Sequence, residues 1–296
     1  MQEKHMSDVL YFYRQTSAFT YLGPYENFAK NLTDDVKELA LLQRRQIIHP
    51  VAIINARKGI RADEVELSEI PFDALLFENE RFHTAGSIMH ELLRRDKNYS
   101  LERKTKDKLH LCCREQAILL ASILKAKGIP ARARSGFAPY ISDGTTAFDH
   151  WITEWFDEKS GRWILTDADC CEEKIDFDPF DFSRDRFIFG AQAYLGLRKG
   201  NFKTEQIRHA SNPPTYGIKA ALWGMFFDFH SLMNDEIFFW HKPRYLEECN
   251  YDLSEQQYKE LDDLAELMLE PEKNFHELKK IWDTVPKFRD LAGGFN

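Results

Sequence analysis

Two adjacent cysteines, Cys112 and Cys113, stand near the start of LHLCCREQAILLASILKAKGIP, which spans residues 109–130. Apolar residues recur behind them at the spacing of one helical face, and Gly128 and Pro130 supply a stop. We therefore predict a helix that begins near Cys113. A thiol at a helix N-terminus meets unpaired N–H groups and the positive end of the helix dipole, which both favour the thiolate. Cys113 is therefore a candidate nucleophile.

A cysteine nucleophile also needs a base within hydrogen-bond reach and a group that orients this base. DHWITEWF and RWILTDAD read as two strands, and the turn residues DEKSG between them predict a hairpin. The start of one strand then lies beside the end of the other, which places His150 opposite an acid. This acid is Asp167 if the loop is DEKS with Gly161 as a bulge, and Asp169 if the loop is shorter and has no bulge. His150 would accept the thiol proton, and the carboxylate would hold the imidazole in the required tautomer.

These residues resemble the transglutaminase-like superfamily, whose pattern is close to G-x-C-R-D-x-A, an apolar helix, G-[IV]-P-A-R, an H-x-W-x-E strand and a W-x-x-x-D strand. The matching segments are CREQA at 113–117, GIPARARSGF at 128–137, DHWITEWF at 149–156 and WILTD at 163–167. The resemblance implies a papain-like cysteine architecture with a triad of Cys113, His150 and Asp167. It selects Cys113 over Cys112 and Asp167 over Asp169.

Two positions depart from the family pattern. Leu111 replaces the usual glycine two places before the nucleophile, which could narrow the approach to the thiol. Trp151 follows the histidine directly instead of standing two places after it, so we expect it on the opposite face of the sheet. A narrower resemblance, over IDFDPFDFSRDRF at 175–187, QIIHP and the segment near Trp223, is to bacterial transglutaminase-like proteins of unassigned substrate.

The segments around the cysteines predict a helical framework. LTDDVKELALLQRRQIIHP, with Thr33 as its N-cap, and residues 84–95 predict helices before the cysteines. ARARSGFAPY predicts a strand after them, and the alternation of Arg132 and Arg134 with alanines favours a solvated strand face. The basic run at 94–108 favours a solvated loop.

The C-terminal third adds further helices. Residues 217–240 predict one or two core helices, and Ser254 with Gln257 forms a capping box for another. We therefore predict an α+β fold, in which helices surround an antiparallel sheet, and the resemblance specifies it as a papain-like, transglutaminase-core fold. We expect a single domain of residues 1–296, with a catalytic core at about 84–190 and helical elaborations at 1–83 and 191–296.

Charge and composition disfavour several classes of protein. The 296 residues are 43% hydrophobic and 30% charged, as in ordinary globular proteins, and the formal net charge of -8 disfavours a general nucleic-acid binder. No apolar run reaches the ~18 residues that a membrane span needs. The start, MQEKHMSDVLYFYRQ, lacks the features of a signal peptide. We therefore expect a cytoplasmic protein with reduced thiols, no nucleic-acid partner and no membrane partner.

The cysteines also allow two other interpretations. They form two adjacent pairs and one single residue: Cys112 and Cys113, Cys170 and Cys171, and Cys249. Structural zinc sites usually space their ligands as C-x-x-C, so the paired spacing disfavours zinc. A thiol redox protein is disfavoured for the same reason, because no C-x-x-C occurs in the sequence.

The candidate residues together predict cysteine-dependent acyl transfer. Cys113 would attack an amide carbonyl, its backbone N–H would supply one oxyanion donor, and the acyl group would pass through a thioester to water or an amine. The expected partners are a protein or peptide amide substrate and, for transamidation, an amine acceptor. We expect no cofactor, and the sequence contains no calcium loop of the D-x-[DN]-x-[DN]-G type. The alternative is a non-catalytic binding module on the same scaffold.

Overall fold

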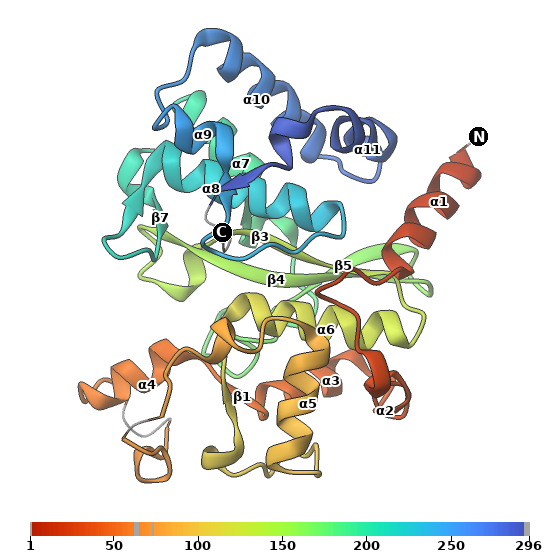
Figure 1. Ribbon diagram of the computed structural model, residues 1–296, viewed down its shortest axis with the longest axis vertical. Helices are drawn as coiled ribbons and strands as arrows, with labels where there is room; N and C mark the ends of the chain where they lie inside the picture. The colour runs from red at the N-terminus through yellow and green to blue at the C-terminus, as the bar shows by residue number, and fades with distance from the viewer. Residues whose placement is uncertain (1, 62–64, 73, 293–296) are drawn as a thin grey trace. The chain divides into compact units, whose positions relative to one another are not determined.

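The chain forms two compact units in the computed structural model, which describes residues 2–61, 65–72 and 74–292 (Figure 1). The first unit comprises the residues up to Phe12, Ala133–Trp151, and the residues from Ser183 onward. The second unit comprises Tyr13–Arg132 and Ile152–Phe182. Three elements run from one unit into the other: α1 (Gln2–Arg14), β3 (Ala131–Ala138) and β4 (Ala147–Asp157). The single domain predicted for residues 1–296 stays a prediction.

Helices make up most of the second unit. Its α-helices are α2 (Glu26–Lys30), α3 (Val36–Arg44), α4 (Pro50–Arg57), α5 (Ala85–Arg95) and α6 (Cys113–Ala126). Its 3-10 helices are η1 (Gly23–Tyr25), η2 (Leu67–Glu69), η3 (Glu78–Glu80) and η4 (Thr105–Asp107). Strands β1 (Ile47–Ile48) and β2 (Leu109–His110) pair in parallel, and β5 (Arg162–Thr166) pairs antiparallel with β4. Helix α6 lies at the centre of this unit and contacts α2, α3 and α5 (Figure 1).

The two helices predicted before the cysteines are present, but the end predicted for the first is wrong: α3 ends at Arg44, and Ile47 and Ile48 form β1. Its N-cap also differs from the prediction. Helix α5 begins directly after Thr84, whose hydroxyl accepts the N–H of Ser87 at 3.3 Å in a capping box. The N-cap of α3 is Asp35 rather than Thr33, because the Asp35 carboxylate accepts the N–H of Glu38 at 3.0 Å. The hydroxyl of Thr33 instead donates to the Glu38 side chain.

Helix α6 has the predicted start and stop. It begins at Cys113, and Gly128 follows it in the left-handed conformation with a φ of +82°. The N–H of Gly128 donates to the carbonyl of Lys125, and the N–H of Ile129 donates to that of Leu124, both at 2.9 Å. This Schellman arrangement satisfies carbonyls that the helix end leaves without intrahelical partners.

The hairpin of β4 and β5 is also confirmed, and it has a regular register. Thr153 lies opposite Thr166, and Asp157 lies opposite Arg162, so the loop comprises residues 158–161. The register that makes Gly161 a bulge is therefore wrong, although Gly161 does adopt a positive φ of 68°. The described ladder ends at the Thr153–Thr166 pair, before either candidate acid.

The first unit combines a small sheet with helices. The strand order is β6–β3–β4–β7–β8, where β6 (Ile188–Phe189) and β8 (Thr215–Tyr216) form antiparallel pairs and β7 (Ile207–His209) pairs parallel with β4. Its helices are α7 (Gly190–Arg198), α8 (Gly217–Leu232), α9 (Arg244–Glu248), α10 (Glu255–Met268) and α11 (Phe275–Thr284). Its remaining elements are η5 (Pro139–Ile141), η6 (Arg184–Arg186), η7 (Thr204–Gln206), η8 (Pro286–Phe288) and the antiparallel pair β9 (Lys242–Pro243) and β10 (Leu291–Ala292).

Apolar side chains of α7, α8 and α10 form the core of the first unit. Phe226, Phe229 and Leu264 are among its buried members. The capping box predicted from Ser254 and Gln257 is present at the start of α10. The described residues thus combine helices with mainly antiparallel strand pairs, as an α+β fold requires. Every described helix is too short or too polar to cross a membrane.

The solvated face predicted for the arginines of β3 is wrong, because both side chains are fully buried. In the second unit, Arg132 forms an ion pair with Glu154 at 2.6 Å and stacks on the Trp163 ring. In the first unit, Arg134 binds Asp228 of α8 through two hydrogen bonds of 2.8 and 2.9 Å. Alternation with alanine does not distinguish a solvated face from a buried face whose charges are paired.

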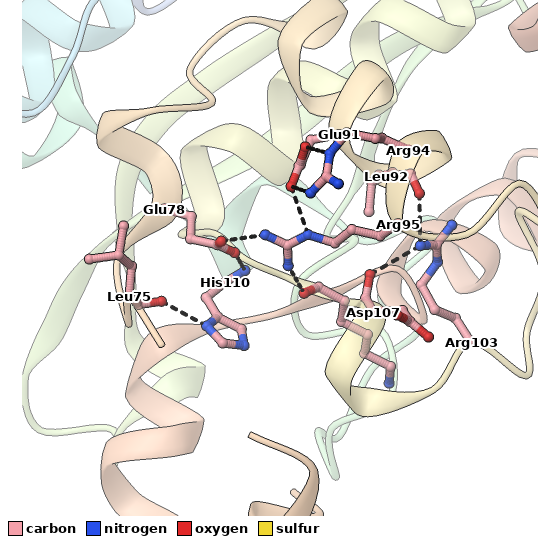
Figure 2. A network of polar contacts seen from close by, with 10 residues as sticks. Leu75, Glu78, Glu91, Leu92, Arg94, Arg95, Arg103, Asp107 and His110 are labelled. Carbon is pink, nitrogen blue, oxygen red and sulfur yellow. Dashed lines mark hydrogen bonds and ion pairs between the residues drawn. The ribbon is translucent and has the colours of Figure 1, made fainter. Parts of the chain in front are cut away.

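The basic run at 94–108 is only partly the solvated loop that its composition predicts. Arg103 is 4% exposed and donates to four backbone carbonyls at 3.0–3.3 Å, those of Leu92, Asp96, Asn98 and Asp107. Two of these hydrogen bonds are visible in Figure 2. The loop therefore folds around one buried guanidinium, which donates to carbonyls of α5, of η4 and of the residues between them.

Candidate active site

Cys113 is the first residue of α6, and two residues, Leu111 and Cys112, connect β2 to this helix. The N–H of Leu111 donates to the carbonyl of Ile48 at 3.2 Å, which extends the β1–β2 pairing up to the cysteines. The Cys113 side chain is only 5% exposed, and the Leu111 side chain is fully buried. The strand before Cys113 and the helix after it thus both restrain the backbone of the candidate nucleophile.

The N-cap of α6 is Cys112, which is an unusual residue for this position. Asp35, Thr84 and Ser254 cap α3, α5 and α10 through side-chain oxygens that accept N–H groups. A thiol is only a weak acceptor, and the Cys112 sulfur lies 3.7 Å from the side-chain oxygen of Asn79. No side-chain oxygen of the N-cap residue accepts a hydrogen bond at the start of α6. The positive potential of this helix end therefore remains available to a thiolate at Cys113.

Two charged residues follow Cys113, and both are buried. Arg114 forms an ion pair with Glu115 at 2.6 Å, and its guanidinium lies 5.1 Å from the Phe19 ring centroid. Burial raises the pKa of the Glu115 carboxyl, although the adjacent Arg114 acts in the opposite direction. A negative charge on Glu115 would oppose a thiolate two residues away at Cys113, so the raised pKa of Glu115 weakens this opposition.

Asp167 follows β5 directly and is fully buried. One carboxylate oxygen accepts the N–H groups of Asp169 at 3.1 Å and Cys170 at 3.0 Å. Its own N–H donates to the carbonyl of Pro179 at 2.8 Å. These three hydrogen bonds fix both the backbone and the carboxylate of Asp167, as an orienting group in a triad requires.

The rival acid, Asp169, makes different contacts. Its carboxylate accepts a hydrogen bond of 2.5 Å from the Gln116 side chain, and it lies 3.9 Å from the His49 ring nitrogen Nε2. The Gln116 bond joins the first turn of α6 to the segment after β5. The hydroxyl of Thr153 in β4 also donates to the carbonyl of Ala117, at 3.1 Å. Within the second unit, the helix that carries Cys113 is therefore hydrogen-bonded to β4 and to the segment that follows β5.

His150 lies in β4, in the part of the strand that belongs to the first unit. Its side chain is 3% exposed, and the Tyr140 ring packs edge-on at a centroid distance of 6.2 Å. The next residue, Trp151, packs against Phe227 of α8 at 6.0 Å. Because side chains alternate along a strand, His150 points to the opposite face of the sheet from Trp151 and α8.

The predicted triad is thus distributed over both units. Cys113 and Asp167 belong to the second unit, and His150 belongs to the first. The convergence of these three side chains therefore stays a prediction. Gln116 was missed by the sequence reasoning, although its place one helical turn after Cys113 puts it on the same helix face.

Two other cysteines are poor candidates for a nucleophile. Burial raises the pKa of the Cys170 thiol well above its usual range, and the neighbouring Asp167 adds to this shift. Burial likewise raises the pKa of the Cys171 thiol to about 12. Since the thiolate is the nucleophile, neither thiol is ready for that role at neutral pH.

Comparison with known families bears out the resemblance seen in the sequence. Residues 94–168, about a quarter of the chain, match the family model of the transglutaminase-like superfamily. The matched segment contains Cys113, His150 and Asp167. No curated protein and no solved structure matches the chain.

Proposed function

We propose that this protein is a transglutaminase-like cysteine acyltransferase or amidohydrolase, with a papain-like core and a triad of Cys113, His150 and Asp167. Cys113 is the nucleophile, His150 the general base and acid, and Asp167 the group that orients the imidazole. The substrate is an amide of a protein or peptide. The observation that carries the proposal is the family match, because its 75-residue segment, 94–168, includes all three side chains in the order that the chemistry needs.

The reaction proceeds in two half-reactions. The Cys113 sulfur bonds to the amide carbon while its proton passes to the His150 ring, and the ring then protonates the amine that leaves as the C–N bond breaks. Water or a second amine attacks the resulting thioester and gives its proton to His150. The ring returns this proton to the sulfur as the C–S bond breaks, which releases an acid or a new amide.

The surroundings of Cys113 support its role as nucleophile. The thiol stands at the N-terminus of α6, where the helix dipole and the backbone N–H groups stabilise negative charge. The backbone N–H of Cys113 would supply one donor to the oxyanion of the tetrahedral intermediate. Between the two candidate acids, the W-x-x-x-D pattern of the family favours Asp167, which ends WILTD, as the partner of His150.

Selective alkylation tests this proposal. We expect iodoacetamide at pH 7 to label Cys113 before the other four cysteines, as measured by peptide mass spectrometry. His150→Ala should slow this labelling by about tenfold or more, because the general base sustains the thiolate. His90→Ala is the matched control, since His90 is exposed and bonds to Tyr25 instead.

A second measurement distinguishes a Cys113 thiol that iodoacetamide reaches slowly from one that is not ionised. Thiolate absorbance near 240 nm, taken as the difference between the protein and Cys113→Ser, should titrate below the ordinary cysteine pKa of about 8.5. A Cys113 that titrates above this value and that labels no faster than Cys112 would refute the proposal. That outcome would favour the non-catalytic binding module.

A further inference from the structure

A pocket of about 380 Å³ lies in the second unit, between η2, η3, the end of α5 and β2. Ile70, Pro71 and Leu75 form apolar parts of its wall. Arg81, Arg94 and Lys106 are among its charged lining residues. This volume is within the range of about 300–1,000 Å³ that is usual for sites that bind small molecules.

A satisfied charge network forms one side of the pocket (Figure 2). Glu78, which is 6% exposed, accepts a hydrogen bond from the Arg95 guanidinium and another, of 2.8 Å, from the backbone N–H of His110. Arg95 also donates to Glu91 at 2.9 Å and to the carbonyl of Lys108 at 2.6 Å. The charges of Glu78 and Arg95 therefore balance each other and make this side of the pocket rigid.

The same network orients Arg94 at the edge of the pocket. The Arg94 guanidinium binds Glu91 through two hydrogen bonds of 2.7 and 2.8 Å, yet its side chain is 62% exposed. The hydrogen bond from Arg94 is the main reason why the pKa of Glu91 falls to about 2, so Glu91 stays ionised at neutral pH. These two bonds use Nε and Nη2, which leaves the remaining Nη1 donors to meet a ligand.

Two further cations, Arg81 and Lys106, line the pocket. Among the residues that the structure describes, the side chains of Arg81 and Lys106 form no ion pair. Among the described lining residues, Glu69 is the remaining carboxylate, and the backbone N–H of Lys106 approaches it at 3.4 Å. The described lining of the pocket therefore carries more positive than negative charge, which favours an anionic ligand.

His110 adds a directed polar group. Its side chain lines the pocket although the residue is only 5% exposed, and Nδ1 donates to the carbonyl of Leu75 at 2.9 Å. A carbonyl can only accept, so this bond fixes the proton on Nδ1. Nε2 has no hydrogen-bond partner among the described residues, and a ligand hydroxyl or N–H group could fill this place.

We propose that this pocket binds a small organic anion, with a carboxylate or phosphate head at Arg81, Arg94 and Lys106 and an apolar body against Ile70 and Leu75. The three cations come from three separate segments, and Arg94 presents the planar donor array that both head groups match. The proposal does not rest on the acyl-transfer function. The pocket does adjoin the cysteine segment, since His110 stands three residues before Cys113.

Calorimetric titration of the whole protein in phosphate-free buffer tests the pocket. The probes are phenyl phosphate, benzoate, inorganic phosphate and benzyl alcohol, which separate the contributions of the head group and the apolar body. We expect one equivalent of phenyl phosphate or benzoate to bind with a Kd on the order of 0.1–1 mM. The anion that binds more tightly identifies the head group, and inorganic phosphate and benzyl alcohol should each bind at least about fivefold more weakly.

Matched variants locate the binding. Arg81→Gln and Lys106→Gln should each raise the Kd of the more tightly bound anion by about tenfold, because each variant removes a charge-assisted contact. Lys97→Gln should change its affinity less than twofold, because Lys97 is an exposed cation of the same loop that does not line the pocket. Unchanged melting temperatures establish that the variants remain folded.

Several outcomes would overturn the inference. If Lys97→Gln weakens anion binding as much as Arg81→Gln and Lys106→Gln do, the affinity depends only on the net charge of the protein. If benzyl alcohol binds as tightly as the anions, the cations do not contribute to binding. If inorganic phosphate binds as tightly as phenyl phosphate, the apolar wall does not contribute. An absence of binding by both organic anions at 10 mM, about tenfold above the weakest expected Kd, would dismiss the site.

Discussion

Loss of the negative charge at Asp228 should destabilise the protein strongly. Asp228 and Arg134 are both fully buried, and two hydrogen bonds of 2.8 and 2.9 Å join them. Asp228 also accepts the N–H of Ser135 at 3.1 Å. Asp228→Asn keeps the shape of the side chain but turns an NH₂ group toward a guanidinium or an amide that needs an acceptor. The variant therefore removes the negative charge that Asp228 presents to the buried Arg134 guanidinium.

The size of this effect follows from burial. Removing one partner of a buried ion pair costs about 3–5 kcal/mol. The entropy of unfolding is about 2.1 cal/mol/K per residue, or about 0.6 kcal/mol/K for a chain of 296 residues. The melting temperature should therefore fall by about 5–8 °C if the chain unfolds as one unit, and by more if the first unit unfolds alone.

Thermal unfolding followed by circular dichroism measures this difference. The matched control is Asp262→Asn, because Asp262 pairs with Arg198 at 3.2 Å on the surface and the two side chains are 34% and 31% exposed. This control should lose less than about 1 kcal/mol. The double variant Arg134→Met, Asp228→Leu should regain much of the lost stability, since it removes both charges. A melting temperature of Asp228→Asn no lower than that of the control would refute the argument.

Two further predictions concern polar contacts in the second unit. Gln116→Ala should lower the free energy of unfolding by about 1.5–3 kcal/mol in urea titrations, because it removes the 2.5 Å hydrogen bond to the Asp169 carboxylate. The exposed Gln256→Ala should lower it by under ~0.5 kcal/mol, and equal losses would contradict the role of Gln116. The hydrogen bond from Arg94 lowers the pKa of Glu91 from 4.5 to about 2, so its contribution to stability is complete above pH 5 and is lost as the pH falls toward 2. Glu91→Gln should reduce the loss of unfolding free energy between pH 5 and pH 2. An unchanged loss in this variant would contradict the contribution assigned to Glu91.

Local signals in the sequence predicted the elements that carry the candidate nucleophile. The start of α6 at Cys113 and its end before Gly128 depend on residue types within a few positions, and the structure has both. The hairpin of β4 and β5 follows in the same way from the turn residues between two aromatic strands. The register could not be predicted, because the loop fits a regular ladder as well as a bulge and only the pairing decides between them.

Features that depend on distant segments could not be read from the sequence. Arg134 resembles a solvated strand residue until Asp228, which lies 94 positions later, covers it from α8. Arg103 lies in a run that is basic throughout, and only the folded loop singles it out for burial. The pocket of the second unit is likewise assembled from segments between Glu69 and His110 that share no motif. In each case a charge is placed by tertiary contacts, which composition does not encode.

The first turn of α6 is held more firmly than packing alone requires. The Gln43 side chain donates to the carbonyl of Gln116 at 2.8 Å, and the Gln116 side chain in turn donates to Asp169. Both glutamines are fully buried, and burial of an amide is unfavourable unless hydrogen bonds compensate for the loss of water. An apolar helix such as α6 could be buried without these amides. Gln116 stands one turn after Cys113, and Gln43 of α3 binds its carbonyl. The proposed nucleophile needs such support, because a displacement of about 1 Å can lower the rate of catalysis about a hundredfold.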